Sequence, residues 1–246
     1  MKFSLIIPTY NEKESIIYII NKLIAISWEE FPEIIVVDDG SKEKVSNLRE
    51  LNIKKIKIFR HEKNRGYGAA LKTGIRNSKY DNIAIIDADG TYPNDKIGEI
   101  VKVFEDGNYD MVVGARTGEN VHIPLIRKPA KWFLNKLACY LTETKIPDLN
   151  SGLRIMKKDV VNRFLHLLPA SFSFTSTITL AMLTSGYSVK YIPIDYFKRK
   201  GKSKIKPIRD TLNFIQLIIR TILYFNPLKV FIPLSFFLVI FAFIVL

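Results

Sequence analysis

Short apolar runs alternate with helix-like segments along the first half of the chain. Apolar residues recur every three or four positions between residues 16 and 24 and again between 97 and 104, which is the spacing of a helix with one buried face. Strands that alternate with such helices predict an α/β fold, in which helices cover both faces of a mostly parallel sheet. The predicted strands are Phe3–Ile7, Ile34–Val37, Ile56–Phe59, Ile83–Ile86 and Met111–Val113.

The pattern changes from about residue 124 onward. Longer helix-like stretches replace the regular alternation, and an amphipathic stretch with a single charged residue precedes the C-terminal region. The predicted elements are helices over Pro124–Leu141, Asp159–Leu168 and Ser173–Ser185, a polar loop over Pro147–Arg154, a strand over Val189–Phe197, and the amphipathic segment Thr211–Phe225.

The last seventeen residues, Val230–Leu246, contain no charged side chain. A membrane-spanning helix needs ~20 mostly apolar residues; Leu228 extends this run, and Lys229 can reach the polar interface. A buried core helix is the alternative, but such a helix normally carries a polar stripe. We therefore expect a transmembrane segment here. The start of the chain lacks the apolar length and cleavage site of a signal peptide, so we expect the main body on the cytosolic side.

The composition adds a strong basic surplus. The chain has 37 basic and 24 acidic residues, a formal net charge of +13. This charge suits an anionic partner, such as nucleotide phosphates, nucleic acid or acidic lipid headgroups. A hydrophobic content of 48% supplies a core and excludes disorder as the main state. The single cysteine, Cys139, excludes an intramolecular disulfide framework and a cysteine-rich zinc site.

Polar motifs follow three of the predicted strands. They are Pro8–Glu12 (PTYNE), Asp38–Ser41 (DDGS) and Asp87–Gly90 (DADG). One such motif alone can be a helix cap or a turn. The carboxyl ends of parallel strands meet at one edge of the sheet, where ligands bind, so three together indicate a binding site. The carboxylates of Asp87 and Asp89 suit Mg²⁺, which commonly joins one or two carboxylates to substrate phosphates.

At this point the sequence resembles a known family. PTYNE, DDGS, NRGYGAA, DADGTYP, GAR, SGLR and KRKGKSK occur in the order seen in family 2 glycosyltransferases, and the set is most similar to the polyprenyl-phosphate, dolichyl-phosphate mannose synthase-like group. The resemblance covers roughly Met1 to Arg209. It implies an A-type glycosyltransferase fold over residues 1–206, an amphipathic juxtamembrane helix over 207–226 and a transmembrane segment over 227–246.

The resemblance also implies roles for individual residues on the donor side. Asp89, with Asp87, is expected to hold Mg²⁺ or Mn²⁺, and the basic loop Lys198–Lys204 is expected to close over the donor diphosphate. Position 91 is threonine, where other family members carry a glutamine that can bind metal. The expected donor-binding residues are Pro8, Tyr10, Glu12, Asp39, Gly66, Asp87, Lys198 and Arg199, with Gly68 giving close backbone approach beside Gly66.

On the acceptor side, the resemblance makes Arg116 and Arg127 candidates for binding a phosphate, which planar guanidinium groups recognise well. Asp148 is expected to orient the site, and Ser151 to shape the acceptor pocket. A phosphate monoester has a second pKa of ~6, so it arrives largely deprotonated and needs no general base. The residues expected to carry catalysis are Asp89, Asp148, Arg116 and Arg127.

The resulting hypothesis is an inverting, metal-dependent enzyme that transfers one sugar from a nucleotide sugar to a polyprenyl phosphate, dolichyl or undecaprenyl. It is expected at the cell membrane, with its catalytic domain on the cytosolic side and anionic lipids as partners. Two alternatives stay open. A family 2 enzyme that glycosylates a hydroxyl of a glycan or lipid needs a base, and no QxxRW processivity string occurs. A basic nucleic-acid-binding module predicts basic residues interleaved with exposed aromatics instead of strand-end carboxylates, so we expect no nucleic-acid partner.

Overall fold

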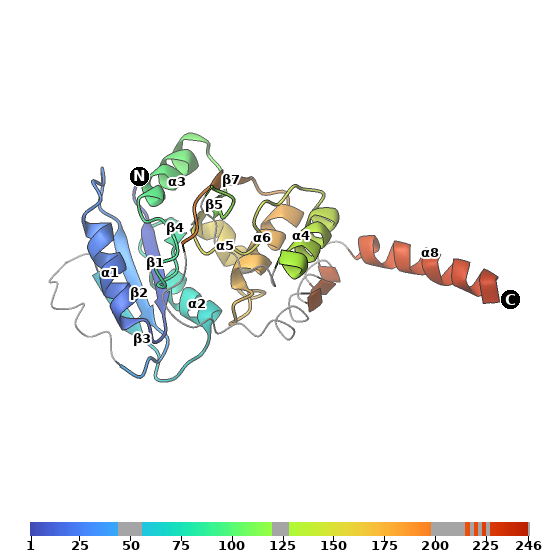
Figure 1. The fold of residues 1–246 in the computed structure, drawn as a ribbon, viewed down its shortest axis with the longest axis horizontal. Coiled ribbons are helices and arrows are strands. Elements are labelled where there is room, and N and C mark those ends of the chain that lie inside the picture. Colours follow the sequence, from blue (N-terminus) through green and yellow to red (C-terminus); the bar gives the residue numbers. More distant parts are fainter. Residues whose placement is uncertain are drawn as a thin grey trace.

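The computed structural model describes residues 1–43, 56–119 and 128–197, and in the C-terminal region residues 215–216, 219–220, 223–224 and 227–245. The described chain forms a seven-stranded sheet in the order β3-β2-β1-β4-β6-β5-β7 (Figure 1). The strands are β1 (Ser4–Thr9), β2 (Glu33–Asp38), β3 (Ile56–Arg60), β4 (Asn82–Ile85), β5 (Met111–Ala115), β6 (Arg154–Lys157) and β7 (Val189–Pro193).

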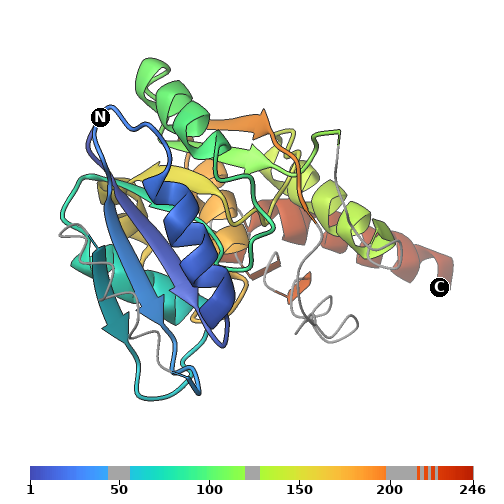
Figure 2. The ribbon, with the colours of Figure 1, turned by 60° about the vertical axis from the view of Figure 1, so that its left-hand side comes forward.

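Helices cover both faces of this sheet, and each face has its own apolar core (Figure 2). Helices α1 (Lys13–Ile24) and α3 (Lys96–Asp106) pack on one face, where residues such as Ile16 and Ile100 are fully buried. Helices α2 (Tyr67–Asn77), α5 (Lys158–Phe164) and α6 (Phe174–Thr184) pack on the other. The α/β fold with a mostly parallel sheet, predicted from the periodicity, is therefore confirmed.

Among the described strands, β6 was not predicted from the sequence pattern. Residue 154 was expected to end a polar loop, but it begins a strand that pairs antiparallel with both β4 and β5. The other pairings in the sheet are parallel. Because β6 runs the opposite way, its first residue lies at the edge where its neighbours end. The loop that precedes β6 is thereby delivered to the carboxyl ends of the parallel strands.

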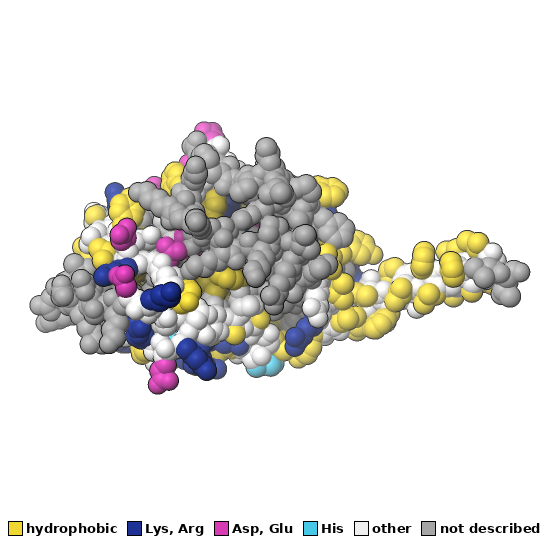
Figure 3. Space-filling view, turned by 60° about the horizontal axis from the view of Figure 1, so that its bottom comes forward, with side chains coloured by type: hydrophobic (Ala, Val, Ile, Leu, Met, Phe, Trp, Pro, Cys, Tyr) yellow, Lys and Arg dark blue, Asp and Glu magenta, His cyan; other side chains and the backbone are white. Residues whose placement is uncertain are grey.

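Two further helices lie on the C-terminal side of the molecule. Helix α4 (Lys128–Thr142) belongs to the body, and helix α8 (Leu228–Val245) extends away from it (Figure 1). Apolar side chains are exposed along α8 (Figure 3). Within the described ranges, no helix has both the length and the apolar character needed to cross a membrane. The transmembrane segment expected over 227–246 is therefore not confirmed.

The start of α2 packs closely against the loop that precedes α6. The amide of Ala69 donates to the carbonyl of Ala170 at 3.2 Å. Gly66 has a φ of +102°, and a Cβ there would collide with the Ala170 carbonyl oxygen; a Cβ at Gly68 would collide with that of Pro169. The close approach expected of these glycines is thus made, in this structure, to the backbone of residues 169–171.

The close contact at Gly68 and the open space at Gly98 predict opposite effects of an alanine substitution on the stability of the protein. Gly68→Ala should destabilise the protein by about 1–3 kcal/mol, because a backbone carbonyl cannot move aside as a flexible side chain can. Gly98→Ala in α3 is the matched control, since a Cβ there meets nothing within 4 Å. It should stabilise by up to ~1 kcal/mol through helix propensity. Urea unfolding of both variants measures this, and equal stabilities would contradict the packing.

Candidate active site

The carboxyl ends of β1 and β2 are joined by hydrogen bonds. The Asn11 amide donates to Ser41 Oγ at 2.8 Å, and the Lys42 amide donates back to Asn11 Oδ1 at 2.9 Å. Asn11 takes a φ of +55°, which asparagine tolerates better than most residues. These bonds hold the PTYNE and DDGS motifs together, as expected, with Pro8 buried and Tyr10 and Glu12 half-buried along the same edge.

Asp38 and Asp39 are both buried, and each has its own set of donors. Asp38 accepts from Arg60 Nη1 at 2.8 Å and from the Ser41 amide at 2.9 Å. Asp39 accepts the backbone amides of Arg65 and Gly66 at 2.9 and 2.8 Å. Asp39, an expected donor-binding residue, thus also holds the segment before α2 in place through its carboxylate.

A buried histidine completes the surroundings of Asp39. His61 Nδ1 lies 2.7 Å from Asp39 Oδ1, and its Nε2 lies 2.9 Å from Thr73 Oγ1 on α2. His61 was not among the residues predicted from the sequence to belong to the site. A signal was present, since His61 comes two positions after the predicted strand at residues 56–59, but its pairing with Asp39 depends on β2 and β3 being neighbours in the sheet.

Asp87 lies beneath the strand edge, packed between an aromatic hydroxyl and a glycine. Tyr67 Oη donates to Asp87 Oδ1 at 2.7 Å, and the Tyr67 ring stacks on Phe172 with the ring centroids 5.5 Å apart. A Cβ at Gly152 would collide with the carboxylate, so this glycine leaves the space that Asp87 occupies. Burial, followed by the charge of Asp89, raises the pKa of Asp87 to about 6.

Asp89 lies on the turn that follows. Thr91 donates to Asp89 Oδ1 twice, from its hydroxyl at 2.6 Å and its amide at 3.2 Å. Threonine at position 91 thus fixes a carboxylate where relatives are expected to use glutamine. Among the described residues, no group of three or more His, Cys, Asp or Glu side chains could hold a metal ion. Asp87 and Asp89 are neighbouring carboxylates whose negative charges repel each other. Together they nevertheless suit a divalent cation that takes its other ligands from substrate phosphates.

Arg116 and Asp148 form a buried ion pair at the end of β5. Arg116 Nε and Nη2 lie 2.6 and 2.9 Å from the two carboxylate oxygens, and the Arg116 amide donates to Asp148 Oδ2 at 3.0 Å. Asn150 Oδ1 accepts a further bond from Nη2 at 2.5 Å, and the guanidinium lies 5.1 Å from the Tyr196 ring centre. Since the pair uses Nε and Nη2, a phosphate would have to approach through Nη1.

Arg154, in the SGLR motif, is a fully buried cation that sequence reasoning left without a role. Its guanidinium donates to the carbonyls of Ser151 and Thr175 and to the hydroxyl of Thr179. It therefore ties the loop before β6 to helix α6. Ser151, expected in the acceptor pocket, is fully buried and donates its hydroxyl to the Gly114 carbonyl at 2.5 Å. In this structure it supports the loop.

Three predicted site residues, Arg127, Lys198 and Arg199, lie outside the described residues. The residue before the basic loop is described. The Phe197 amide donates to the Thr91 carbonyl at 2.9 Å, and the Tyr196 ring packs edge-on against Tyr92 with the centroids 5.3 Å apart. Phe197 therefore lies beside Thr91, which is two residues after Asp89 in the chain.

Comparison with known proteins gives a family match. Residues 4–165 match the family model described as Glycosyl transferase family 2. The dolichol-phosphate mannosyltransferase of Pyrococcus furiosus is 27% identical over 220 residues, which are 84% of this chain and 60% of that protein. The chain thus spans about three fifths of the length of this relative.

Two solved structures are similar in fold. TarS of S. aureus, residues 1–349 in complex with UDP-GlcNAc, has a TM-score of 0.65 at 18% identity, covering 92% of this chain and 68% of that one. Glucosyl-3-phosphoglycerate synthase from Mycobacterium tuberculosis, in complex with Mn²⁺, UDP and glucosyl-3-phosphoglycerate, has a TM-score of 0.66 at 15% identity, covering 91% and 79%. At these identities the likeness shows the fold, which agrees with the expected A-type architecture.

Because the pKa of Asp87 is raised in the folded protein, ionisation of this carboxyl group should lower the free energy of unfolding. Between about pH 4 and 6 the folded state keeps a proton that the unfolded state releases, so stability falls as pH rises through this window. At neutral pH the ionised carboxylate costs at most about 3 kcal/mol, from ~1.4 kcal/mol per pKa unit. Asp87→Asn should therefore be more stable than the parent at pH 7.5, by about 1–3 kcal/mol, and should lose less stability between pH 5 and 7.5.

The measurement is urea unfolding of metal-free protein at both pH values. Asp95→Asn is the matched control, because Asp95 is an exposed carboxylate on the same loop. If Asp87→Asn shows the same pH dependence as the parent, Asp87 is not the group that titrates at a stability cost.

Proposed function

The chain belongs to glycosyl transferase family 2, and on that premise we propose that it transfers a single sugar, with inversion, from a nucleotide sugar to a polyprenyl phosphate at the cytosolic face of a membrane. The donor class is supported by the similar folds that hold UDP-GlcNAc or UDP. The polyprenyl phosphate is supported by the likeness to a dolichol-phosphate mannosyltransferase.

The observation that carries the choice of acceptor is the state of Asp148. Its carboxylate accepts three hydrogen bonds from Arg116 alone, so it is engaged in holding that arginine and is poorly placed to take a proton from a hydroxyl. A hydroxyl acceptor needs such a base. A phosphate acceptor is already largely ionised at neutral pH and needs only to be positioned. The site therefore favours a phosphate.

In the proposed reaction, an oxygen of the acceptor phosphate attacks the anomeric carbon of the sugar. The bond from that carbon to the donor diphosphate breaks, and its electron pair leaves with the nucleoside diphosphate. Asp89 and Asp87 would hold Mg²⁺ or Mn²⁺, which would neutralise charge on the departing diphosphate. Arg116 would contribute positive charge to the site, so positioning and electrostatic stabilisation would supply most of the catalysis.

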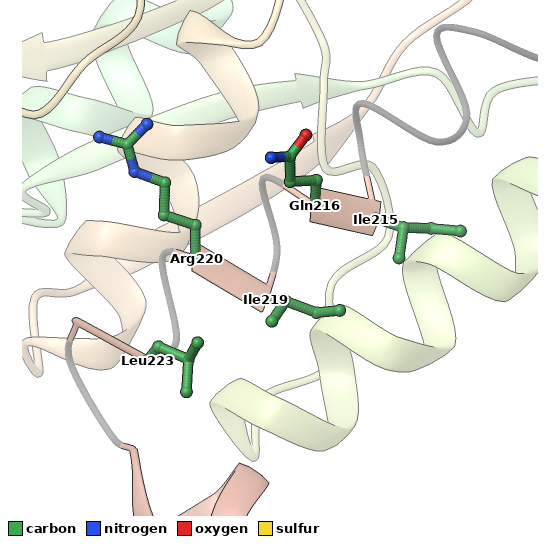
Figure 4. Close-up of a pocket in the computed structure, with 5 residues that line it drawn as sticks. All are labelled: Ile215, Gln216, Ile219, Arg220 and Leu223. Atoms are coloured by element: carbon green, nitrogen blue, oxygen red, sulfur yellow. The ribbon is translucent and has the colours of Figure 1, made fainter.

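The proposed membrane location rests on helix α8 and the segment before it. The exposed side chains of α8 are predominantly apolar from Leu228 to Ile244. In the preceding segment, Ile215, Ile219 and Leu223 point to one side of the chain while Gln216 and Arg220 point to the other, and these five residues line a cavity of about 470 Å³ (Figure 4). This arrangement is typical of a helix that lies in a membrane interface.

The metal role of Asp89 predicts a specific loss. Asp89→Asn should reduce turnover by at least about 100-fold, the scale expected when one electrostatic stabiliser of a transition state is removed, while the fold stays intact by circular dichroism. EDTA should inhibit the parent enzyme, and Mg²⁺ or Mn²⁺ should restore it. Asp95→Asn serves as the control and should keep parental activity. Full activity of the parent in EDTA would exclude a metal-dependent reaction.

The acceptor assignment is tested with a short polyprenyl phosphate, a panel of nucleotide sugars and mass analysis of the product. Arg127→Ala should lower the efficiency with the phosphate acceptor about 10–150-fold, because a charge-assisted contact contributes ~1.5–3 kcal/mol, and should leave nucleotide affinity unchanged. Arg163→Ala, on the exposed side of α5, is the control. Transfer to the free polyprenol or to a glycan hydroxyl, with none to the phosphate, would overturn the proposal.

A further inference from the structure

Helix α4 exposes an aromatic and basic stripe that the catalytic proposal does not use. Trp132 and Tyr140 are 64% and 61% exposed, and Lys136 between them is exposed as well. These three residues are spaced four apart, so they lie along one side of the helix. We call them the α4 stripe. Large aromatic side chains that are mostly exposed on one helix face indicate a contact surface.

The other side of α4 is turned toward the protein body. Ala138 is fully buried in a cluster with Ile146 and Leu180, and Asn135 donates its side-chain amide to the Ile146 carbonyl at 2.7 Å. These contacts fix the rotation of the helix about its axis. The direction of the α4 stripe is therefore set by packing and does not depend on a flexible loop.

The α4 stripe is continuous with the start of α8. Lys229 Nζ lies 2.5 Å from a carboxylate oxygen of Glu143, directly after the end of α4, and Val230 packs against the same cluster as Ala138. The apolar helix α8 therefore begins where α4 ends, and Figure 1 shows it leaving the body from this side. Any surface that α8 enters must lie close to the end of α4.

We propose that the α4 stripe is a membrane-contact surface that sits at the headgroup level of an anionic bilayer. The inference rests on the proposed membrane function and adds a second, rigid contact to it. Tryptophan and tyrosine are enriched at the boundary between headgroups and acyl chains, where one end of the ring is apolar and the other polar. Lys136 lies between them as a partner for anionic headgroups, in a chain with a net charge of +13.

Such a contact has a consequence for the site. Helix α8 alone would tether the body and leave its tilt free, whereas two contact regions fix which edge of the sheet faces the bilayer. Residue 128, the first of α4, follows Arg127, the expected ligand of the acceptor phosphate. A helix that lies at headgroup level therefore places its first residue, 128, at the depth at which a lipid phosphate is found.

The test uses the intrinsic fluorescence of the full chain. It contains two tryptophans, and Trp28→Phe removes the one that packs against Phe3 and leaves Trp132 as the only reporter. Vesicles of phosphatidylcholine and phosphatidylglycerol, with and without brominated acyl chains, are the probe. We expect a blue shift of the Trp132 emission on vesicle binding and strong quenching by the brominated lipid.

Matched variants distinguish vesicle binding through the α4 stripe from general electrostatic attraction between the basic chain and the anionic vesicles. Lys136→Gln should weaken binding to the anionic vesicles about fivefold at low salt, since one basic residue near such a surface contributes ~1 kcal/mol, and the difference should shrink at high salt. Lys102→Gln on α3 removes the same charge from a distant exposed position and should have a smaller effect. Trp132→Ser with Tyr140→Ser should also weaken binding, and Tyr18→Ser on α1 should not.

The outcomes distinguish this inference from the proposed function. If the chain floats with vesicles and glycosylates polyprenyl phosphate, but Trp132 is neither shifted nor quenched, the α4 stripe is not a membrane contact and the proposed function stands. If the chain does not bind vesicles at all, both are overturned. A blue shift that depends on protein concentration without lipid would assign the stripe to self-association and overturn the inference.

Discussion

The architecture depends on the burial of several carboxylates at one edge of a sheet. An ionised carboxylate is costly to bury unless donors satisfy it, and each buried carboxylate at this edge has its own partners. Asp38 has Arg60, Asp39 has two amides and His61, and Asp148 has Arg116, while the half-buried Asp87 has Tyr67. These partners come from strands and helices far apart in the chain, so satisfying the carboxylates also fixes the relative positions of the elements that form the site.

The carboxylates differ in how many hydrogen bonds they accept, and this difference suggests which of them support the site and which could bind a ligand. Asp39 and Asp148 each accept three hydrogen bonds, which holds them in place as supports for the loop at 65–66 and for Arg116. Asp87 lies in an apolar and aromatic setting beside another acid, so its pKa rises to about 6. A carboxylate whose ionised form is disfavoured in this way is a candidate for binding a cation, because a bound cation would stabilise the negative charge.

The sequence predicted the parallel core well, because strands buried on both faces are continuous apolar runs, as Ile34–Val37 shows. The motifs at the ends of β1, β2 and β4 were also predicted to lie together, because the carboxyl ends of parallel strands meet at one edge of the sheet. Strand β6 was missed because Arg154, a charged residue, begins it, and only the tertiary partners Ser151, Thr175 and Thr179 make its burial possible. The roles of Ser151 and of Gly66 likewise depended on neighbours, the Gly114 and Ala170 carbonyls, that no local pattern reveals.

Under the proposed function, a site at a membrane would need a rigid rim, and the ion pairs and hydrogen bonds of the buried charged residues supply that rigidity. If the acceptor is a polyprenyl phosphate, as proposed, its chain is costly to remove from the bilayer, at ~0.8 kcal/mol per CH₂, so the enzyme would have to bind at the lipid surface. Its phosphate stays at headgroup level, and the anomeric carbon must meet it there within reacting distance. A mobile rim would lose that alignment. The ion pair between Arg116 and Asp148 and the hydrogen bond from Arg154 to Thr179 of α6 hold the proposed acceptor side of the site in place. Under the proposed function, the position of the body on the membrane would then set the position of the reacting groups.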